Sequence, residues 1–267
     1  MSLIAIVIVN YNQLLKNSAI FKKDMDSNQE LIFVVDNSTN VDIQKQNLEY
    51  CSEKRNVTYL SHEKNLGISK AYNVAIKEIR KTDCQYLLLL DADTDIASEY
   101  IEKMKELLER KEIDLILPII RTKKGAIMSP CKRGKYGLFK HYDDIAQIEV
   151  NHQLSAINSG MCISRNIWES YQYDEQLFLD YVDHQFMKDF FQRSNKIYIM
   201  KDIVLVQDFS AETDDLQKAK FRYSIQTKDI RYFLKKNKYP FYCIWIHMWR
   251  RKLRLFIKNK KPEVLFW

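Results

Sequence analysis

Apolar positions in the first 120 residues follow two alternating patterns. Continuous β-branched or leucine-rich runs occupy four segments: 3–9, 31–35, 86–90 and 114–120. Such runs are typical of strands that are buried on both faces of a parallel sheet. Apolar residues recur at helical spacing in 68–79 and again in 98–111. Strands that alternate with helices predict an α/β fold with a doubly wound, mostly parallel sheet.

The chain after residue 120 has a less regular pattern. Residues 121–160 are broken by glycine and proline, and we expect them to form loops and short strands that cover a site. Apolar spacing predicts a helix over 180–193, and a capping sequence at 213–215 predicts a longer helix that reaches Lys236. We therefore expect two units: a catalytic unit formed by residues 1–212, and a helical extension, rich in basic and aromatic residues, formed by residues 213–267.

Composition narrows the class of protein. With 267 residues, of which 46% are hydrophobic, the chain can bury a substantial core, so disorder is not expected. The five cysteines are scattered and show no C-x-x-C spacing, which favours a reducing compartment over a disulfide framework or a zinc site. No apolar stretch approaches the roughly 20 residues that span a bilayer, and the N-terminus lacks the features of a signal peptide. We therefore expect a cytoplasmic protein.

Charge is divided unevenly along the chain. Residues 216–267 hold 15 Lys and Arg against two acidic residues, whereas residues 1–215 hold 27 basic and 33 acidic residues. An aromatic run at 239–249 precedes the basic segment 250–258. This combination favours an anionic membrane surface as the partner of the tail. The alternative is packing against the catalytic unit or the second subunit of a homodimer; nucleic acid is not expected, because no recognition motif accompanies the charge.

Polar residues follow the predicted strands where ligands bind in sheets of this kind. Asp91 and Asp93 stand two residues apart after an apolar strand, so their carboxylates can point to the same side and share one hard cation, Mn²⁺ or Mg²⁺. The alternative is that they cap a turn or the next helix. A calcium-binding EF-hand loop is excluded, because Ile96 occupies the position that requires glycine.

Four motifs resemble those of the family 2 inverting glycosyltransferases, which have the GT-A fold. They lie in the order and spacing of that family, at 6–12, 34–38, 65–73 and 89–93. The resemblance extends over roughly residues 3–210, and the wording of 178–183 resembles most the bacterial rhamnosyltransferase-like members. It implies a nucleotide-sugar donor and a divalent metal as cofactor.

The resemblance also implies roles for single residues on the donor side. The residue matching Asp36 accepts hydrogen bonds from the nucleotide base, Asp91 meets the ribose and the metal's surroundings, and Asp93 ligates the metal. The expected donor-binding residues are Asn10, Asn12, Asp36, Asn65, Gly67, Asn73, Asp91 and Asp93. Many relatives place a metal-binding histidine near 206–210, and here Gln207 or Asp208 would replace it, with Asp208 the expected third metal ligand.

On the acceptor side, the resemblance implies that Asp183 is the catalytic base, with Asp180 as a second candidate. Ser159 and Gly160 match the acceptor-side loop. The expected function is inverting transfer of a hexosyl or rhamnosyl group to a glycan or lipid-linked acceptor, in bacterial surface polysaccharide biosynthesis at the inner face of the membrane. The alternatives are a catalytically idle scaffold and a sugar nucleotidyltransferase, although no glycine-rich loop follows the first strand.

Overall fold

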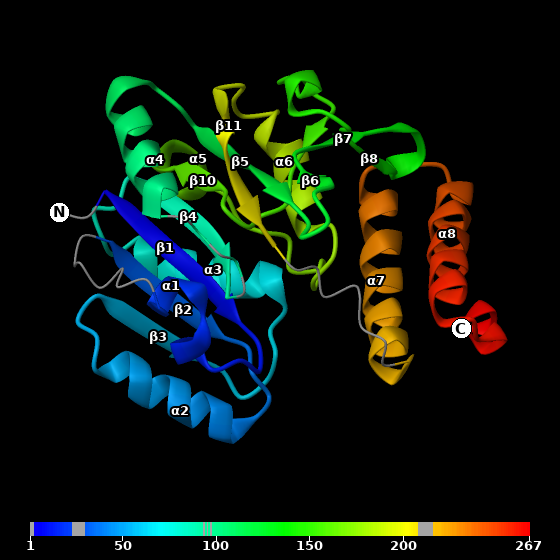
Figure 1. Ribbon diagram of the computed structural model, residues 1–267, viewed down its shortest axis with the longest axis horizontal. Coiled ribbons are helices and arrows are strands. Elements are labelled where there is room, and N and C mark those ends of the chain that lie inside the picture. Colours follow the sequence, from blue (N-terminus) through cyan, green and yellow to red (C-terminus); the bar gives the residue numbers. More distant parts are fainter. Residues whose placement is uncertain (1–2, 23–29, 93, 95, 97, 208–215) are drawn as a thin grey trace.

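A central sheet flanked by helices forms the body of the molecule, and two C-terminal helices lie side by side at one end (Figure 1). The computed structural model describes residues 3–22, 30–92, 94, 96, 98–207 and 216–267. The strands of the sheet are β1 (Ile4–Asn10), β2 (Leu31–Asp36), β3 (Val57–Ser61), β4 (Tyr86–Asp91), β5 (Leu115–Arg121), β6 (Ile127–Ser129), β10 (Cys162–Ser164) and β11 (Ile197–Val206). The helices are α1 (Ala19–Lys22), α2 (Val41–Ser52), α3 (Ile68–Ile79), α4 (Ser98–Arg110), α5 (Arg165–Trp168), α6 (Val182–Phe190), α7 (Leu216–Lys236) and α8 (Tyr242–Asn259).

The strand order is β11-β5-β10-β4-β1-β2-β3, with β6 attached to β5. Strand β10 runs antiparallel to β4 and β5, and the other neighbours on this path are parallel. The parallel register pairs Asn10 with Asp36 and Val9 with Asp91. The carboxyl ends of β1, β2 and β4 therefore meet at one edge of the sheet, where the sequence predicts a ligand site.

Alternation along the strands explains why helices cover both faces. Ala5 and Val7 of β1 belong to a core cluster with the apolar faces of α3 and α6, whereas Ile4, Ile6 and Ile8 belong to a second cluster with α4. Successive side chains of a strand point to opposite faces, so a continuous apolar run buries both. The prediction of a doubly wound, mostly parallel sheet is confirmed, with β10 making the sheet mixed.

A second, smaller sheet lies beyond β6. It contains β7 (Cys131–Arg133), β8 (Phe139–His141) and β9 (Leu154–Ser155), in the order β8-β7-β9. These short strands lie within the segment expected to form loops and short strands over a site. The same region approaches the C-terminal helices, because Nε2 of His247 in α8 donates a hydrogen bond to the carbonyl oxygen of Tyr136, 2.8 Å away.

The C-terminal helices pack on the sheet domain through part of their surface. Ile230, Phe233 and Leu234 of α7 and Cys243 of α8 belong to the same core cluster as β4 and α6. The division at residue 212 stays a prediction, and the cap expected at 213–215 lies outside the described residues. Among the helices the structure describes, none is both long and apolar enough to cross a bilayer.

Candidate active site

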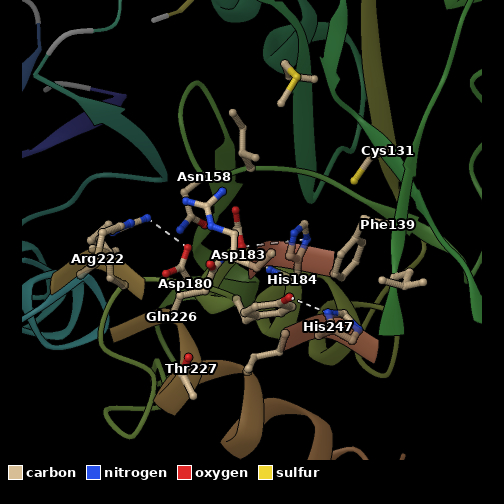
Figure 2. A pocket seen from close by; sticks show the side chains of 18 of the residues that line it. Cys131, Phe139, Asn158, Asp180, Asp183, His184, Arg222, Gln226, Thr227 and His247 are labelled. Atoms are coloured by element: carbon tan, nitrogen blue, oxygen red, sulfur yellow. Dashed lines mark hydrogen bonds and ion pairs between the residues drawn. The ribbon is translucent and has the colours of Figure 1, made fainter. Parts of the chain in front are cut away.

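A cavity of about 580 Å³ lies between the end of β4, the start of α6 and the two C-terminal helices. Figure 2 shows Asp183 and His184 of α6 beside Asn158, with Asp180 facing Arg222 of α7. The lining residues with charged or amide side chains are Asp91, Asn158, Asp180, Asp183, Gln207, Arg222, Gln226, Arg250, Arg251 and Arg254. The structure thus brings together three carboxylates that the sequence singles out, Asp91, Asp180 and Asp183.

Asp91 lies at the end of β4, where its carboxylate accepts a 2.8 Å hydrogen bond from Nε2 of Gln207. The oxygen of the same amide, Oε1 of Gln207, is buried and has no hydrogen-bond partner among the described residues. A carboxylate beside an unpartnered amide oxygen is a set of hard oxygen donors, which suits Mn²⁺ or Mg²⁺. The residues present therefore fit the divalent metal that the resemblance implies.

Two expected metal ligands, Asp93 and Asp208, lie outside the described residues. Across the part of the chain that the structure describes, His, Cys, Asp and Glu side chains do not gather in groups of three or more that could hold a metal ion. Asp91 and Gln207 are thus the described half of the expected metal site. The resemblance implies that Gln207 or Asp208 replaces a metal-binding histidine; Gln207 contacts Asp91, and the role of either residue in metal binding stays a prediction.

Asp183 sits in the first turn of α6 with its side chain 19% exposed. The helix begins after Tyr181, whose φ of 66° turns the chain sharply. The carboxylate accepts a 2.7 Å hydrogen bond from the backbone amide of His184. Burial raises the pKa of Asp183 from 3.8 to about 7, because the charged form loses hydration, and the backbone hydrogen bond only partly offsets this.

His184, next to this carboxylate, is held in the neutral form. Its ring stacks on Phe139 at 3.5 Å between centroids, and Nδ1 lies 2.7 Å from the hydroxyl of Ser155. Burial, together with electrostatic interactions with His141 and Arg133, lowers the pKa of His184 to about 3. The imidazole therefore does not neutralise Asp183 by ionisation at neutral pH.

Asp180 has charged partners that Asp183 lacks. One of its oxygens is 3.0 Å from the guanidinium of Arg222, while the other, Oδ2, is buried and has no hydrogen-bond partner among the described residues. Burial raises the pKa of Asp180 to about 6, and Arg222 pulls it in the opposite direction. Of the two candidates for the base, Asp183 has the higher pKa and no ion-paired arginine.

The loop before α6 is fixed by a carboxylate that the sequence analysis did not single out. Asp229 of α7 is buried and accepts hydrogen bonds from three consecutive backbone amides, those of Phe178, Leu179 and Asp180, at 3.0, 2.8 and 2.8 Å. A buried carboxylate held by several N–H groups is strongly stabilised. The C-terminal helices therefore position the residues that enter the active site.

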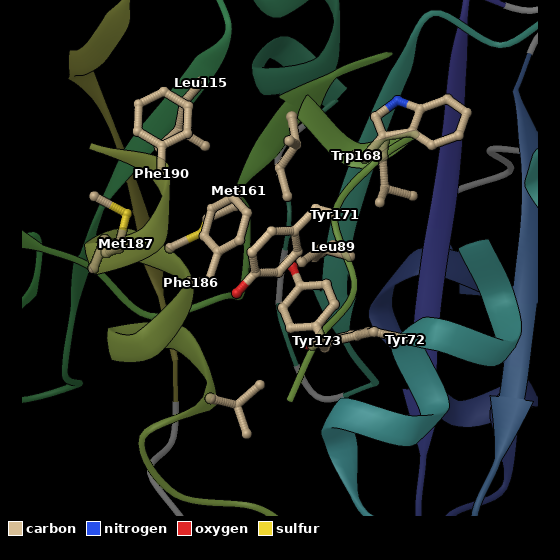
Figure 3. Close-up of a cluster of buried hydrophobic side chains, with 14 of the residues drawn as sticks. Tyr72, Leu89, Leu115, Met161, Trp168, Tyr171, Tyr173, Phe186, Met187 and Phe190 are labelled. Carbon is tan, nitrogen blue, oxygen red and sulfur yellow. The ribbon is translucent and has the colours of Figure 1, made fainter. Parts of the chain in front are cut away.

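An aromatic cluster connects α6 with α3. Figure 3 shows Tyr173, from the segment before α6, between Tyr72 of α3 and Phe186 of α6. The rings of Tyr72 and Tyr173 are 5.0 Å apart, and Tyr173 stacks on Phe186 at 5.7 Å. Such contacts fix the position of α6 relative to the sheet, and with it the position of Asp183.

The expected donor-side residues near β1 and β2 form an internal network. Asp36 is fully buried and accepts hydrogen bonds from Asn10, Asn47 and Tyr59, and from the backbone amide of Ser38. Asn12, at a positive φ of 51°, accepts from the backbone amides of residues 39 and 40. In this structure the oxygens of Asp36 are used by protein donors, and its contact with a base stays a prediction.

Asn65, Gly67 and Asn73 connect the start of α3 to the segment before α6. Asn65 accepts a 2.8 Å hydrogen bond from the amide of Gly67, which has a φ of 78°. A Cβ atom on Gly67 would lie only 2.6 Å from the carbonyl oxygen of Phe178, so a side chain does not fit. Asn73 pairs with the backbone of Tyr173 and lies outside the cavity. A contact between these residues and the donor likewise stays a prediction.

The two acceptor-side residues are buried beneath the cavity rather than lining it. Ser159 is 1% exposed and its hydroxyl lies 2.5 Å from that of Thr94. Gly160, with a φ of 80°, packs so tightly that a Cβ would meet Pro118 at 2.6 Å. The neighbouring Asn158 lines the cavity instead.

A mixed α/β sheet with an aspartate at the end of β4 and a second carboxylate in the same cavity agrees with the GT-A fold of nucleotide-sugar-dependent glycosyltransferases. The model of the family described as Glycosyl transferase family 2 matches residues 5–166, more than half of the chain, and the chain belongs to that family.

Curated relatives agree with this assignment. The chain is 27% identical over 203 residues to the dTDP-rhamnosyl transferase RfbF of Shigella flexneri, covering 75% of this chain and 67% of the relative. It is 24% identical over 277 residues to the uncharacterized glycosyltransferase MJ1057 of Methanocaldococcus jannaschii, covering 99% of this chain and 84% of the relative.

Solved structures share the fold at low sequence identity. S. aureus TarS 1-349 in complex with UDP matches with a TM-score of 0.56 and 18% identity, over 88% of this chain and 66% of that chain. GalNAc-T7 with UDP, GalNAc and Mn²⁺ matches with a TM-score of 0.59 and 15% identity, over 78% of this chain and 43% of that chain. At these identities the likeness supports the GT-A fold alone.

Proposed function

We propose that the protein transfers a hexosyl or rhamnosyl group, with inversion, from a nucleoside diphosphate donor to a hydroxyl group of a glycan or lipid-linked acceptor, in bacterial surface polysaccharide biosynthesis. One observation carries this proposal. Asp183 lies in the same cavity as the strand-end residue Asp91, and burial raises its pKa to about 7. A carboxylate with that pKa is well matched to accept a proton at neutral pH.

In the proposed reaction, the acceptor oxygen bonds to the anomeric carbon while the bond from that carbon to the diphosphate breaks. The hydroxyl proton passes to Asp183, and the nucleoside diphosphate leaves. Asp91 and Gln207, with Asp93 and Asp208, would hold the divalent metal, which supplies positive charge that stabilises the leaving diphosphate. Asp180, paired with Arg222, would position the loop before α6.

The choice of donor follows from the relatives. RfbF is named a dTDP-rhamnosyl transferase, and TarS has been crystallised with UDP-GlcNAc. Incubation of the purified protein with dTDP-rhamnose or UDP-GlcNAc and Mn²⁺ should release dTDP or UDP. Formation of pyrophosphate from a nucleoside triphosphate and a sugar 1-phosphate, without release of dTDP or UDP from the sugar nucleotides, would identify a nucleotidyltransferase, and absence of turnover in both assays would support an idle scaffold.

We also propose that α8 attaches the protein to an anionic membrane surface. Trp245, Trp249, Leu253 and Ile257 are spaced by four residues and are 52–64% exposed, while Cys243, His247 and Leu255 on the other side are buried. The exposed stripe is bordered by basic residues of the segment 250–258. Aromatic side chains at headgroup depth and cations near anionic lipid favour this arrangement. A homodimer contact is the competing explanation.

A further inference from the structure

Three arginines of α8 line the same cavity as the carboxylates of the active site. Arg250, Arg251 and Arg254 fall within little more than one helical turn, and Arg222 of α7 joins them on the cavity wall. Arg254 is four positions from Arg250 and three positions from Arg251, so it is a neighbour of both on the helix surface. Like charges at such spacing repel one another, so a cluster of this kind is stabilised by a bound anion.

Carboxylates of the described residues neutralise little of the positive charge of these arginines. Arg222 is paired with Asp180, but no carboxylate among the described residues forms an ion pair with Arg250, Arg251 or Arg254. Nε of Arg251 is buried and has no hydrogen-bond partner within the described chain. Leaving a buried donor of a charged group unsatisfied is costly. Nε of Arg251 is therefore a buried donor without an acceptor among the described residues, in a side chain that lines the active-site cavity.

The cluster is electrostatically connected to the acceptor side of the site. Burial lowers the pKa of Arg251, while Asp180 raises it and the nearby Arg222 and Arg254 lower it further. The charge of Asp183 in turn raises the pKa of Asp180. The arginines therefore lie in the surroundings of the proposed base, and the donor diphosphate is expected at the end of β4, beside Asp91 and Gln207.

We propose that Arg250, Arg251 and Arg254 bind a phosphate or diphosphate group that the acceptor carries. This inference rests on the proposed function and names the substrate class of its acceptor. The planar guanidinium donates paired hydrogen bonds to phosphate oxygens, and several arginines match the many oxygens of a diphosphate better than the two oxygens of a carboxylate. A neutral sugar hydroxyl would use none of this charge.

Inorganic pyrophosphate is a suitable probe, measured by calorimetry on the full chain in EDTA so that no metal contributes. We expect binding to weaken at least tenfold in the double variant Arg250→Gln/Arg254→Gln, whose side chains are both exposed and whose loss should not affect folding. Arg251→Lys should also weaken binding, because lysine keeps the positive charge but cannot donate the paired hydrogen bonds of a guanidinium. The control Arg55→Gln/Arg110→Gln removes two exposed arginines elsewhere and should bind like the wild type.

A second measurement separates the acceptor from the donor. Binding of dTDP and UDP in the presence of Mn²⁺ should change less than twofold in Arg250→Gln/Arg254→Gln. An equal loss of pyrophosphate and nucleotide binding would assign the arginines to the donor and overturn the inference. Unchanged pyrophosphate binding in the double variant, or an equal loss in the control, would overturn it as well.

A third measurement separates a phosphate in the cavity from lipid headgroups outside it. If the double variant loses binding to phosphatidylglycerol vesicles but keeps its affinity for pyrophosphate, the arginines are headgroup contacts only and the inference is wrong. The variant Asp183→Asn should bind pyrophosphate normally while losing transfer. Turnover that survives in Asp183→Asn would contradict the proposed base. The pyrophosphate measurements on the arginine variants test the phosphate site independently of that result.

Discussion

At the scale of single residues, the proposed reaction depends on Asp183. We expect Asp183→Asn to lower the transfer rate by roughly 10² to 10⁴, the usual contribution of a general base. Because the base acts when deprotonated and burial raises its pKa to about 7, kcat/KM should rise with pH and level off above about 7. Initial rates between pH 5.5 and 9 would show this.

The same measurement includes its control. Asp42 is an exposed carboxylate in the first turn of α2, and Asp42→Asn should leave both the rate and the pH profile unchanged. If Asp180→Asn, but not Asp183→Asn, removed the rise with pH, Asp180 would be the base instead.

The raised pKa of Asp183 also has a consequence for stability. Its pKa in the folded chain, about 7, is above the ordinary value of 3.8, so its favourable contribution is present below pH 4 and is lost as pH rises through 7. Asp183→Asn does not titrate. We therefore expect the variant to unfold at a higher temperature than the wild type at pH 8, with a smaller difference at pH 5. Thermal unfolding at both pH values tests this; equal differences would refute it.

Among the candidate residues, those next to a predicted strand or helix were found most directly from the sequence. Asp91 follows an apolar strand, which is a local signal, whereas Asp183 was assigned through the resemblance to family 2 glycosyltransferases; both line the cavity. Asp229 and Arg251 carry no such local signal. Their roles depend on α7 and α8 folding back on the site from 40 or more residues later in the chain, which the charge of the tail indicates only as a general attraction to anions.

At the scale of elements, Asp229 connects α7 to the loop before α6. In Asp229→Asn, the partly buried amides of residues 178–180 lose a charged acceptor, which should lower the free energy of unfolding by about 2–3 kcal/mol. Activity should fall as well, because this loop positions Asp180 and Asp183. Urea unfolding and initial rates measure the two effects.

The adjacent residue provides the matched control for this prediction. Lys228 is exposed on α7, and Lys228→Gln should change neither stability nor rate beyond experimental error. A stable, fully active Asp229→Asn protein would show that α7 does not hold the loop.

The outer face of α8 provides the second prediction at this scale. Trp245→Ala/Trp249→Ala removes two exposed indoles without touching the buried side of the helix. We expect this variant to bind phosphatidylglycerol vesicles at least tenfold more weakly in co-sedimentation, and binding of the wild type to decrease with added salt. Leu48→Ala, which removes an exposed apolar side chain of α2, is the control.

The oligomeric state decides between the two explanations of this face. If Trp245→Ala/Trp249→Ala bound vesicles like the wild type and changed a dimer into a monomer in sedimentation velocity, the face would be a subunit contact.

The elements that the sequence did not predict have a physical explanation. Helix α2 buries only Asn47 and Cys51, so it has no apolar stripe of the usual width. Strand β3 is at the edge of the sheet, and none of its residues is fully buried. By contrast, β1 and β4 bury most of their side chains and α3 buries half of its residues along one face, and their patterns were sufficient.

At the scale of the whole molecule, binding of donor and metal should raise stability by linkage. A ligand present at a hundredfold excess over its Kd adds about 2.7 kcal/mol to the free energy of unfolding, which for a chain of this size corresponds to a Tm increase of roughly 5–10 °C. We expect dTDP-rhamnose or UDP-GlcNAc to give such an increase with Mn²⁺ and a much smaller one with EDTA, because the proposed metal ligands Asp91 and Gln207 lie in contact beside the end of β4.

A variant assigns the metal-dependent part of this increase to the site. Asp91→Asn should lose most of the difference between Mn²⁺ and EDTA, whereas Asp42→Asn should keep it. Equal Tm increases with Mn²⁺ and EDTA in the wild type would argue against a metal-held diphosphate, and no increase with either sugar nucleotide would argue that the donor is of a different kind. Since stabilisation requires only binding, whereas release of dTDP or UDP requires Asp183, the two measurements together distinguish an enzyme from an idle scaffold.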